Sequence, residues 1–226
     1  MTTTPPEAPV QSVETTPAAE PAPKRARAPS VQPVLEKLFE LYPHLFGAEF
    51  LPLKLGIFQE LLAAHPEQFE RDTLKQALGL HTRSARYLQS VAAGNQRHDL
   101  QGVAVDDVSP QHVYLALLEL FRRRQSRSKD DLRPKFRVQL MAAFEASGMS
   151  RQDYQTTVQT NDEDATVLLE EAFAERDQWL ARQEALARAF EASGKTLPEF
   201  ADMYGMDPRD VSYALAQVRP QPAPAA

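Results

Sequence analysis

Three blocks of the sequence decide the fold: PLKLGIFQEL (Pro52–Leu61), ALGLHTRSARYL (Ala77–Leu88) and RHDLQG (Arg97–Gly102). In the first two blocks apolar residues recur at helical spacing, and in the third a glycine follows a short run that suits a strand. Single cations and one tyrosine stand at the expected helix starts and in the expected hairpin, where a hydrophobic core needs no charge. This placement is typical of a surface that binds phosphate groups.

The pattern around these blocks predicts a compact helical domain. We expect helices over about residues 33–41, 53–64, 72–80, 82–91 and 110–124. Thr82 is predicted to cap the fourth helix, and Ser109-Pro110 to open the fifth. A hairpin with a two-residue turn at Gln101-Gly102 is predicted between these two helices, because RHDL and VAVD flank that pair.

The C-terminal part contains an internal repeat. AFEASGMSRQDY (Ala143–Tyr154) and AFEASGKTLPEF (Ala189–Phe200) share a helix end, a capping glycine and a capping box. A long acidic helix over about Glu163–Ala192 separates the two copies, so we expect a duplicated helical hairpin. The fold class predicted for the chain is mainly α with one small β-hairpin, followed by an all-α acidic C-terminal region.

The end of this region, TLPEFADMYGMDPRDVSYAL (Thr196–Leu215), also fits a helix-turn-helix template. Its second helix carries Asp207, Arg209 and Asp210 and is nearly neutral. Because neutralisation of phosphate charge supplies most nonspecific affinity for DNA, we expect packing or protein binding here in preference to DNA binding.

The charge of the chain is unevenly distributed. Its net value is −6, but residues 54–137 carry 14 basic and 10 acidic groups, whereas residues 138–226 carry 7 and 15. The positive middle segment is typical of nucleic-acid binding. The N-terminus lacks the apolar run of a signal peptide, and no apolar stretch approaches the roughly 20 residues of a membrane helix. We therefore expect a cytoplasmic protein with no membrane partner.

No pattern of a catalytic or metal site is present in the sequence. The chain has no cysteine, which excludes disulfides and thiolate metal sites. There is no P-loop, GxGxxG or GxSxG motif. We expect neither an enzyme nor a bound cofactor or metal; the five histidines show no metal-ligand spacing and are His44, His65, His81, His98 and His112.

The central cations and the tyrosine are the candidate binding residues. Thr82 and Ser84 lie at a predicted helix start, where free backbone N–H groups favour an anion. Arg86 and Tyr87 follow within one turn, and Lys54 opens another predicted helix. The alternative is structural: Thr82 only caps, Tyr87 belongs to the core and the cations are solvated. The residues by themselves leave both interpretations open.

The segment Pro43–Leu120 resembles the ProQ/FinO family of bacterial RNA chaperones, whose domain we expect over about residues 33–125. The similar blocks are YPHLF, PLKLGIFQEL, the AL-x-L-x-T-x-S-x-R-Y-L run, R-x-D-L-x-G and S-P-Q-H-V. The resemblance implies a concave, positively charged face that binds structured RNA. It also implies a role in post-transcriptional regulation, with small RNAs and mRNA 3′ ends as ligands, each a stem with a single-stranded, U-rich 3′ end.

Carried over residue by residue, the resemblance implies specific RNA contacts. Thr82 and Ser84 match the helix start that receives the 3′ end, whereas Gly79, His81 and Ala85 depart from the family pattern. The implied contacts are Lys54, Lys75, Thr82, Ser84, Arg86, Tyr87 and Arg97.

A second set of cations is predicted to make auxiliary, nonspecific RNA contacts. This auxiliary set is Arg83, Arg122, Arg123 and Arg124. The last three begin a basic stretch for which the same contact is predicted and which also contains Arg127, Lys129, Arg133, Lys135 and Arg137. The alternatives for this stretch are a helix end complementing its dipole and a solvated linker.

The expected organisation has five parts. A disordered Pro/Ala-rich tail covers residues 1–32, the RNA-binding domain 33–127, a basic linker 128–137, the acidic helical region 138–218 and a disordered tail 219–226. Two other functions remain open. One is a DNA-binding regulator that uses the helix-turn-helix-like segment, and the other is a scaffold whose acidic helices bind a protein partner or cover the basic face.

Overall fold

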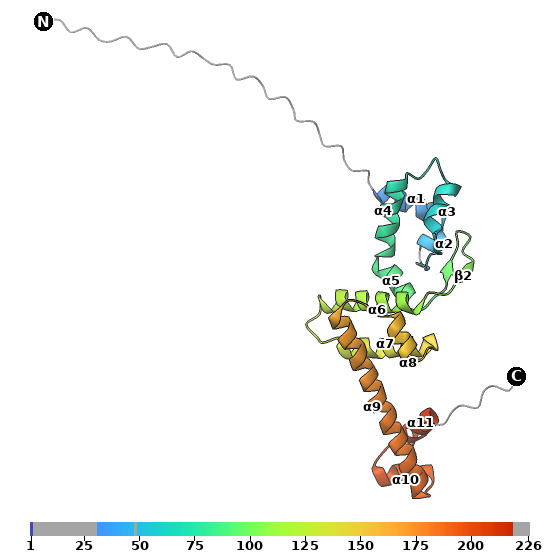
Figure 1. Ribbon diagram of the computed structural model, residues 1–226, viewed down its shortest axis with the longest axis vertical. Coiled ribbons are helices and arrows are strands. Elements are labelled where there is room, and N and C mark those ends of the chain that lie inside the picture. The colour runs from blue at the N-terminus through green and yellow to red at the C-terminus, as the bar shows by residue number, and fades with distance from the viewer. Residues whose placement is uncertain (2–30, 48, 219–226) are drawn as a thin grey trace. The chain divides into compact units, whose positions relative to one another are not determined.

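The computed structural model describes residues 1, 31–47 and 49–218, and most of both expected tails lies outside this part (Figure 1). The described chain is mainly helical with one antiparallel two-stranded sheet, which confirms the predicted fold class. No helix in the described ranges is long and apolar enough to cross a membrane. The elements are α1 (Val31–Leu41), α2 (Pro43–Phe46), α3 (Ile57–Ala64), α4 (Arg71–Thr82), α5 (Ala85–Ala92), β1 (Arg97–His98), β2 (Ala104–Asp106), α6 (Pro110–Gln125), α7 (Arg133–Ser147), α8 (Arg151–Thr157), α9 (Glu163–Ser193), α10 (Leu197–Tyr204) and α11 (Pro208–Val218).

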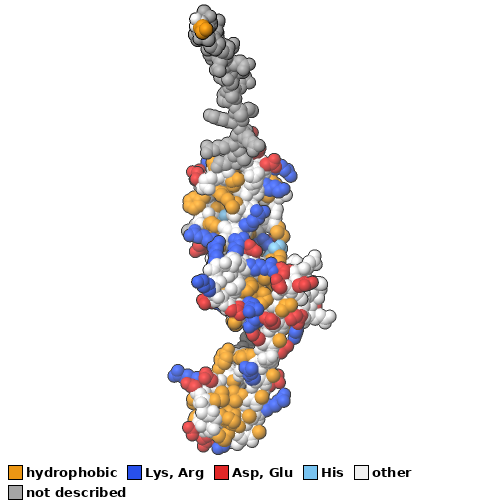
Figure 2. Space-filling view, turned by 90° about the vertical axis from the view of Figure 1, so that its left-hand side faces the viewer, with side chains coloured by type: hydrophobic (Ala, Val, Ile, Leu, Met, Phe, Trp, Pro, Cys, Tyr) orange, Lys and Arg blue, Asp and Glu red, His pale blue; other side chains and the backbone are white. Residues whose placement is uncertain are grey.

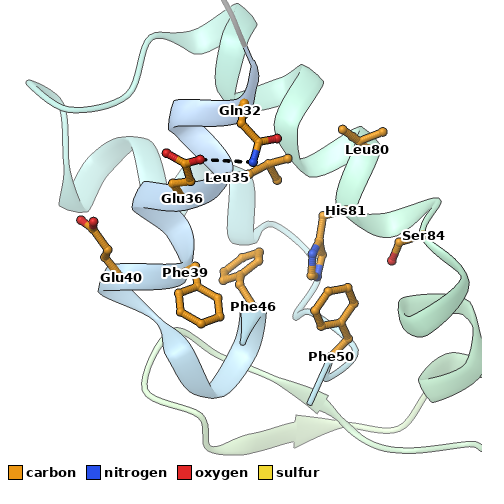
Figure 3. A pocket seen from close by; sticks show the side chains of 10 residues that line it. All are labelled: Gln32, Leu35, Glu36, Phe39, Glu40, Phe46, Phe50, Leu80, His81 and Ser84. Carbon is orange, nitrogen blue, oxygen red and sulfur yellow. Dashed lines mark hydrogen bonds between the residues drawn. The ribbon is translucent and has the colours of Figure 1, made fainter. Parts of the chain in front are cut away.

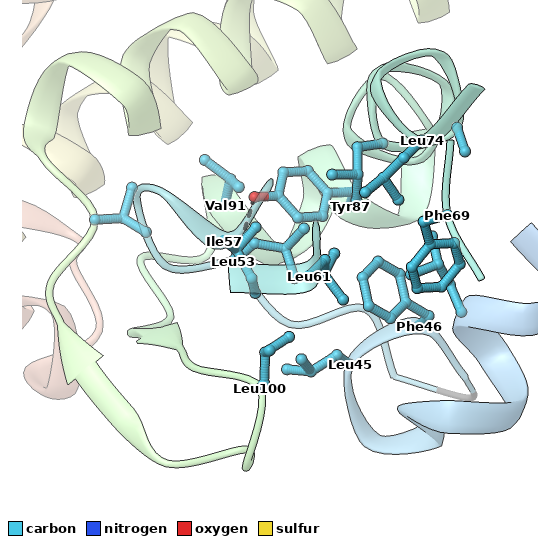
Figure 4. Close-up of a cluster of buried hydrophobic side chains, with 14 of the residues drawn as sticks. Leu45, Phe46, Leu53, Ile57, Leu61, Phe69, Leu74, Tyr87, Val91 and Leu100 are labelled. Atoms are coloured by element: carbon cyan, nitrogen blue, oxygen red, sulfur yellow. Dashed lines mark hydrogen bonds between the residues drawn. The ribbon is translucent and has the colours of Figure 1, made fainter. Parts of the chain in front are cut away.

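The first hydrophobic core lies among α1–α5 and the segments that join them (Figure 4). Leu61 of α3 and Leu74 of α4 are fully buried in it. Leu100, from the loop of the hairpin, closes the core on one side. Burial of each such side chain contributes roughly 1.5–3 kcal/mol. This core holds the starts of α3 and α5 in place, and the candidate site is built on those two starts.

Helix α3 begins later than the sequence predicts. Leu53 forms a parallel bridge with His98, and the Lys54 N–H donates to the His98 carbonyl at 2.9 Å. Gly56 then has a φ of +86°, a left-handed conformation that favours glycine, so the helix starts at Ile57. The prediction that Lys54 opens this helix was wrong, because its segment is hydrogen-bonded to the hairpin.

Helix α5 is capped by Ser84 and not by Thr82. The Ser84 hydroxyl accepts from the Tyr87 N–H at 3.2 Å. Thr82 is the last residue of α4, where its hydroxyl donates to the Leu78 carbonyl at 2.9 Å. The predicted Thr82 cap was wrong because this bond directs the hydroxyl back along α4 and away from α5.

The hairpin connection is longer than predicted. Five residues, 99–103, join β1 to β2. The Asp99 carboxylate accepts from the Gln101 and Val103 N–H groups, each at 2.9 Å. The two-residue turn prediction was wrong because this carboxylate begins the turn two residues before Gln101.

Helix α6 contributes to two cores. One side packs against α5, and its Tyr114, Leu117 and Leu118 belong to a second core built with α7, α8 and α9. The Tyr114 hydroxyl donates to the Ala165 carbonyl of α9 at 3.1 Å. Residues 133–137, which were expected in a linker, form the first turn of α7. The C-terminal helices α7–α9 therefore pack directly on the N-terminal ones.

The repeated AFEASG blocks end two helices in the same way, as predicted. Gly148 and Gly194 both have positive φ, +63° and +59°, at the ends of α7 and α9. Ser150 caps α8, and Thr196 forms a capping box with Glu199 at the start of α10. Their packing differs, because α8 joins the second core whereas α10 packs with α11 in a small third core.

Candidate nucleic-acid interface

The amino end of α5 carries exposed cations and free backbone donors. Arg83 and Arg86 lie on either side of the Ser84 cap, and both side chains are exposed. The N–H groups of Ala85 and Arg86 have no acceptor among the described residues, as is usual in the first turn of a helix. Their partial positive charge adds to the helix dipole. A phosphate oxygen fits this point chemically.

Arg83 extends along α4 and over Gly79. Its Nη2 atom lies 3.8 Å from the position that a Cβ of Gly79 would take, so a cation occupies the space beside the glycine. Lys75 lies one turn earlier on α4 and is exposed. We call Lys75, Arg83 and Arg86 the α5 cation cluster. Figure 2 shows lysine and arginine side chains gathered on one face of the N-terminal helices.

Tyr87 is a structural link between two parts of the site. Its side chain is only 7% exposed, its N–H bonds to Ser84, and its hydroxyl accepts from the Leu53 N–H at 3.1 Å. Burial raises the pKa of this hydroxyl, so it remains protonated. A ring packed in this way presents no free face for a base. Tyr87 therefore fixes the start of α5 against the segment that contains Lys54.

Arg97 is buried without a carboxylate partner. Its side chain is 7% exposed, and its Nη1 donates to the Leu53 carbonyl at 3.0 Å. Its Nη2 lies 3.4 Å from Nδ1 of His112, and burial together with the Arg97 charge lowers the pKa of that histidine. Among the described residues no acidic side chain forms an ion pair with this guanidinium. A buried unpaired cation is unfavourable, so an anion at its exposed edge would stabilise the fold.

Lys54 follows Leu53, the residue whose backbone bonds to Tyr87 and Arg97. Its side chain is half-buried, and Nζ donates to the Glu60 carboxylate at 2.6 Å. That hydrogen bond and the charge of Glu60 raise the pKa of the lysine. Glu60 partly neutralises Lys54, so an RNA phosphate would have to compete with this carboxylate.

The model of the ProQ/FINO family matches residues 28–133. A FinO-like RNA chaperone from Neisseria meningitidis MC58, of known crystal structure, is 31% identical over 38% of this chain and 88% of its own, with a TM-score of 0.35. The chain belongs to the ProQ/FinO family. A ProQ homolog from Legionella pneumophila, solved by NMR, is 25% identical over 51% of this chain and 99% of its own, with a TM-score of 0.35.

At the end of the ProQ/FinO domain, the auxiliary arginines have separate environments. Arg122 forms an ion pair with Asp162, the residue that caps α9. Arg123 pairs with Glu119 at 2.7 Å and also donates to the Arg83 carbonyl at 2.6 Å. The charge of Arg122 is therefore neutralised by Asp162 of the acidic region. Arg123 instead holds the backbone of Arg83, a member of the α5 cation cluster, by a hydrogen bond.

Arg124 differs from its two neighbours. It is exposed, and with Arg127 it lines a cavity of about 550 Å³ that also reaches Ala85 at the start of α5. Arg127 belongs to the basic stretch that the sequence predicts to make auxiliary RNA contacts.

The ProQ/FinO domain thus brings the predicted residues together in two groups joined by Tyr87. The exposed α5 cation cluster lies around the Ser84 cap, and the second group is Arg97, bonded to the Leu53 carbonyl, with Lys54 as the next residue of the chain. Thr82 points its hydroxyl into α4 and belongs to neither group. Within the described residues, no set of three histidine or acidic side chains is placed to hold a metal ion.

Proposed function

We propose that this protein is an RNA chaperone that binds structured RNA without catalysing a reaction on it. Its ligands are stem-loops with single-stranded, U-rich 3′ ends, as in small RNAs and mRNA 3′ ends, and it acts in post-transcriptional regulation in the bacterial cytoplasm. The observation that carries this proposal is the start of α5. There, exposed Arg83 and Arg86 flank two free backbone amides in a domain of the ProQ/FinO family.

Each group of residues has its own part in the proposed binding. The α5 cation cluster binds phosphates along the stem, because side chains read little sequence in an RNA duplex. The amides after Ser84 bind the phosphate or hydroxyl of the RNA 3′ end. Arg97 supplies a buried positive charge, which a phosphate beside Lys54 would neutralise. Tyr87 positions these groups and does not contact RNA.

The test compares Arg86→Ala with a control on a different helix. Arg188 on α9 is also exposed, and its ion pair with Glu184 lies at the surface, so Arg188→Ala removes one arginine charge away from the site. The full-length proteins are titrated with a terminator-type hairpin at several salt concentrations. Arg86→Ala should weaken binding and reduce the slope of log affinity against log salt by about 1, whereas Arg188→Ala should do neither.

The second part of the test uses the RNA itself. Blocking its 3′ hydroxyl with a bulky group should weaken binding, because the start of α5 would then lose its ligand. If Arg86→Ala, Lys75→Ala and Arg83→Ala all bind the hairpin like the natural protein, with intact far-UV circular dichroism, the proposal is wrong.

A protein-binding role for the C-terminal helices is a second candidate function. Helices α10 and α11 have the packing expected of a helix-turn-helix, with Ala201 and Val211 fully buried. Their exposed side chains include Met203, Tyr204 and Tyr213, beside acidic residues that would repel DNA phosphates. Binding of the full chain to duplex DNA at low salt, lost on Arg209→Ala, would instead support the DNA-binding alternative.

A further inference from the structure

A cavity of about 620 Å³ lies beside the start of α5, between α1, α4 and the segment that follows α2 (Figure 3). None of the residues carried over from the family lines it except Ser84. Its walls are mostly apolar and aromatic, with Phe39, Phe46 and Phe50 among them. A volume of this size is within the range of small-ligand sites in proteins.

One polar group in the cavity wall has no partner. His81 is 5% exposed, and its Nε2 makes no hydrogen bond in the described structure. Its ring lies between those of Phe46 and Phe50, with centroids 4.7 and 4.5 Å away (Figure 3). Burial lowers the pKa of His81 to about 4, so the imidazole is neutral near pH 7. An unpaired buried nitrogen is costly, and a ligand that bonds to it would remove this cost.

The rim of the cavity excludes some ligands. Glu36 and Glu40 of α1 line it, and the Gln32 side chain donates to Glu36 at 3.3 Å. These carboxylates repel phosphate but accept hydrogen bonds from the N–H groups of a neutral ligand. The cavity therefore suits a flat, uncharged molecule with both donors and acceptors.

The cavity also adjoins the proposed phosphate site. Ser84 both caps α5 and lines the cavity, so the two sites share a residue. Arg86, which belongs to the proposed phosphate site, also lies near the cavity wall: its guanidinium carbon is 5.8 Å from the centre of the Phe50 ring. A molecule with its anionic part at the start of α5 and a planar part in the cavity would occupy both. A nucleotide has this form.

We propose that this cavity receives one unpaired nucleobase of the RNA whose phosphate binds at the start of α5. The base packs against the Phe39 and Phe50 rings that line the cavity, and its edge bonds to His81 Nε2 and to the carboxylates of the rim. This inference rests on the function proposed above and deepens it. The cavity would then recognise a base in the single-stranded part of the RNA, whereas the cations bind only phosphates.

The experiment compares two RNAs that differ only in bases. Both have the same stem and the same 3′ tail, but in the second RNA the tail nucleotides are abasic, so the phosphates are kept. The full-length protein should bind the abasic RNA on the order of tenfold more weakly, the size expected for loss of base stacking. Failure to bind either RNA would refute the proposed function, whereas equal binding of both would refute only this inference.

Variants of the cavity locate the effect. Phe39→Ala on the rim and His81→Phe in the wall should both reduce the difference between the two RNAs several-fold. His81→Phe keeps an aromatic ring in place, and Phe39 is 52% exposed, so both variants should fold. Leu115→Ala, an exposed apolar residue of α6, is the matched control and should leave the difference unchanged.

A direct measurement completes the test. A 3′ tail that carries 4-thiouracil is photo-crosslinked to the natural protein, and the crosslinked peptide is identified by mass spectrometry. We expect crosslinks in peptides containing Phe39, Phe50 or His81. Crosslinks found only elsewhere, or Phe39→Ala and His81→Phe variants that discriminate between the two RNAs like the natural protein, would overturn the inference.

Discussion

Tyr87→Phe should destabilise the protein although it keeps the aromatic ring. The Tyr87 hydroxyl accepts the Leu53 N–H at 3.1 Å, and both residues are buried. Phenylalanine would leave this N–H without a partner and without access to water. Leaving a buried donor unsatisfied costs about 1–3 kcal/mol, so we expect the free energy of unfolding to fall by this amount. The melting temperature should fall by roughly 2–4 °C for each kcal/mol.

The assay is equilibrium urea denaturation, followed by circular dichroism, of the full-length protein. Tyr213→Phe is the matched control, because its side chain on α11 is 61% exposed and its hydroxyl can bond to water in either state. We expect the control to change the free energy of unfolding by less than about 0.5 kcal/mol. If Tyr87→Phe matches the control, the hydroxyl does not hold Leu53 and the structural role given to Tyr87 is wrong.

Two further predictions concern stability in the ProQ/FinO domain. Because the pKa of His81 is lowered to about 4, its imidazole stays neutral in the folded protein between pH 7 and pH 4. In the unfolded chain the same imidazole binds a proton near pH 6.5. Between pH 7 and pH 4 the free energy of unfolding of the natural protein should therefore fall by about 2–3 kcal/mol more than that of His81→Phe. The measurement is urea denaturation at each pH, and an equal fall for the two proteins would contradict the prediction. Gly102→Ala would place a Cβ 2.6 Å from Cδ2 of His44 at a φ of +77°, and should destabilise the protein more than Gly94→Ala, which has a φ of +73° and open space around it. The positive φ alone should cost each variant about 1–2 kcal/mol. Thermal melts compare the two variants, and equal melting temperatures would exclude an additional steric cost at Gly102.

Features encoded by neighbouring residues were predictable from the sequence. The Ser109 cap before Pro110 and the glycine ends of α7 and α9 are present as expected. Each depends on hydrogen bonds between residues at most a few positions apart, so a short pattern contains the information. The resemblance to the family was also recognisable, because the blocks that carry it follow one another along one continuous segment.

The environments of the site residues were not predictable in the same way. Lys54 was expected at a helix start, but Leu53 beside it pairs with His98, which is distant in the sequence. Tyr87 and Arg97 were expected at the RNA surface and are buried against the Leu53 backbone. Arg122 was expected to be a free cation and is paired with Asp162 of the acidic region. In each case the deciding partner is more than 30 residues away.

The sequence by itself determined the helical class, most helix ends, the acidic and basic halves and the ProQ/FinO family. Only the tertiary structure decided which cations are exposed, as at Arg83 and Arg86, and which are buried or paired, as at Arg97 and Arg122. The physical reason is that helix formation depends on local hydrogen bonds and on the spacing of apolar residues. Exposure and charge pairing depend on which distant segments pack together, and this information is spread over the whole core.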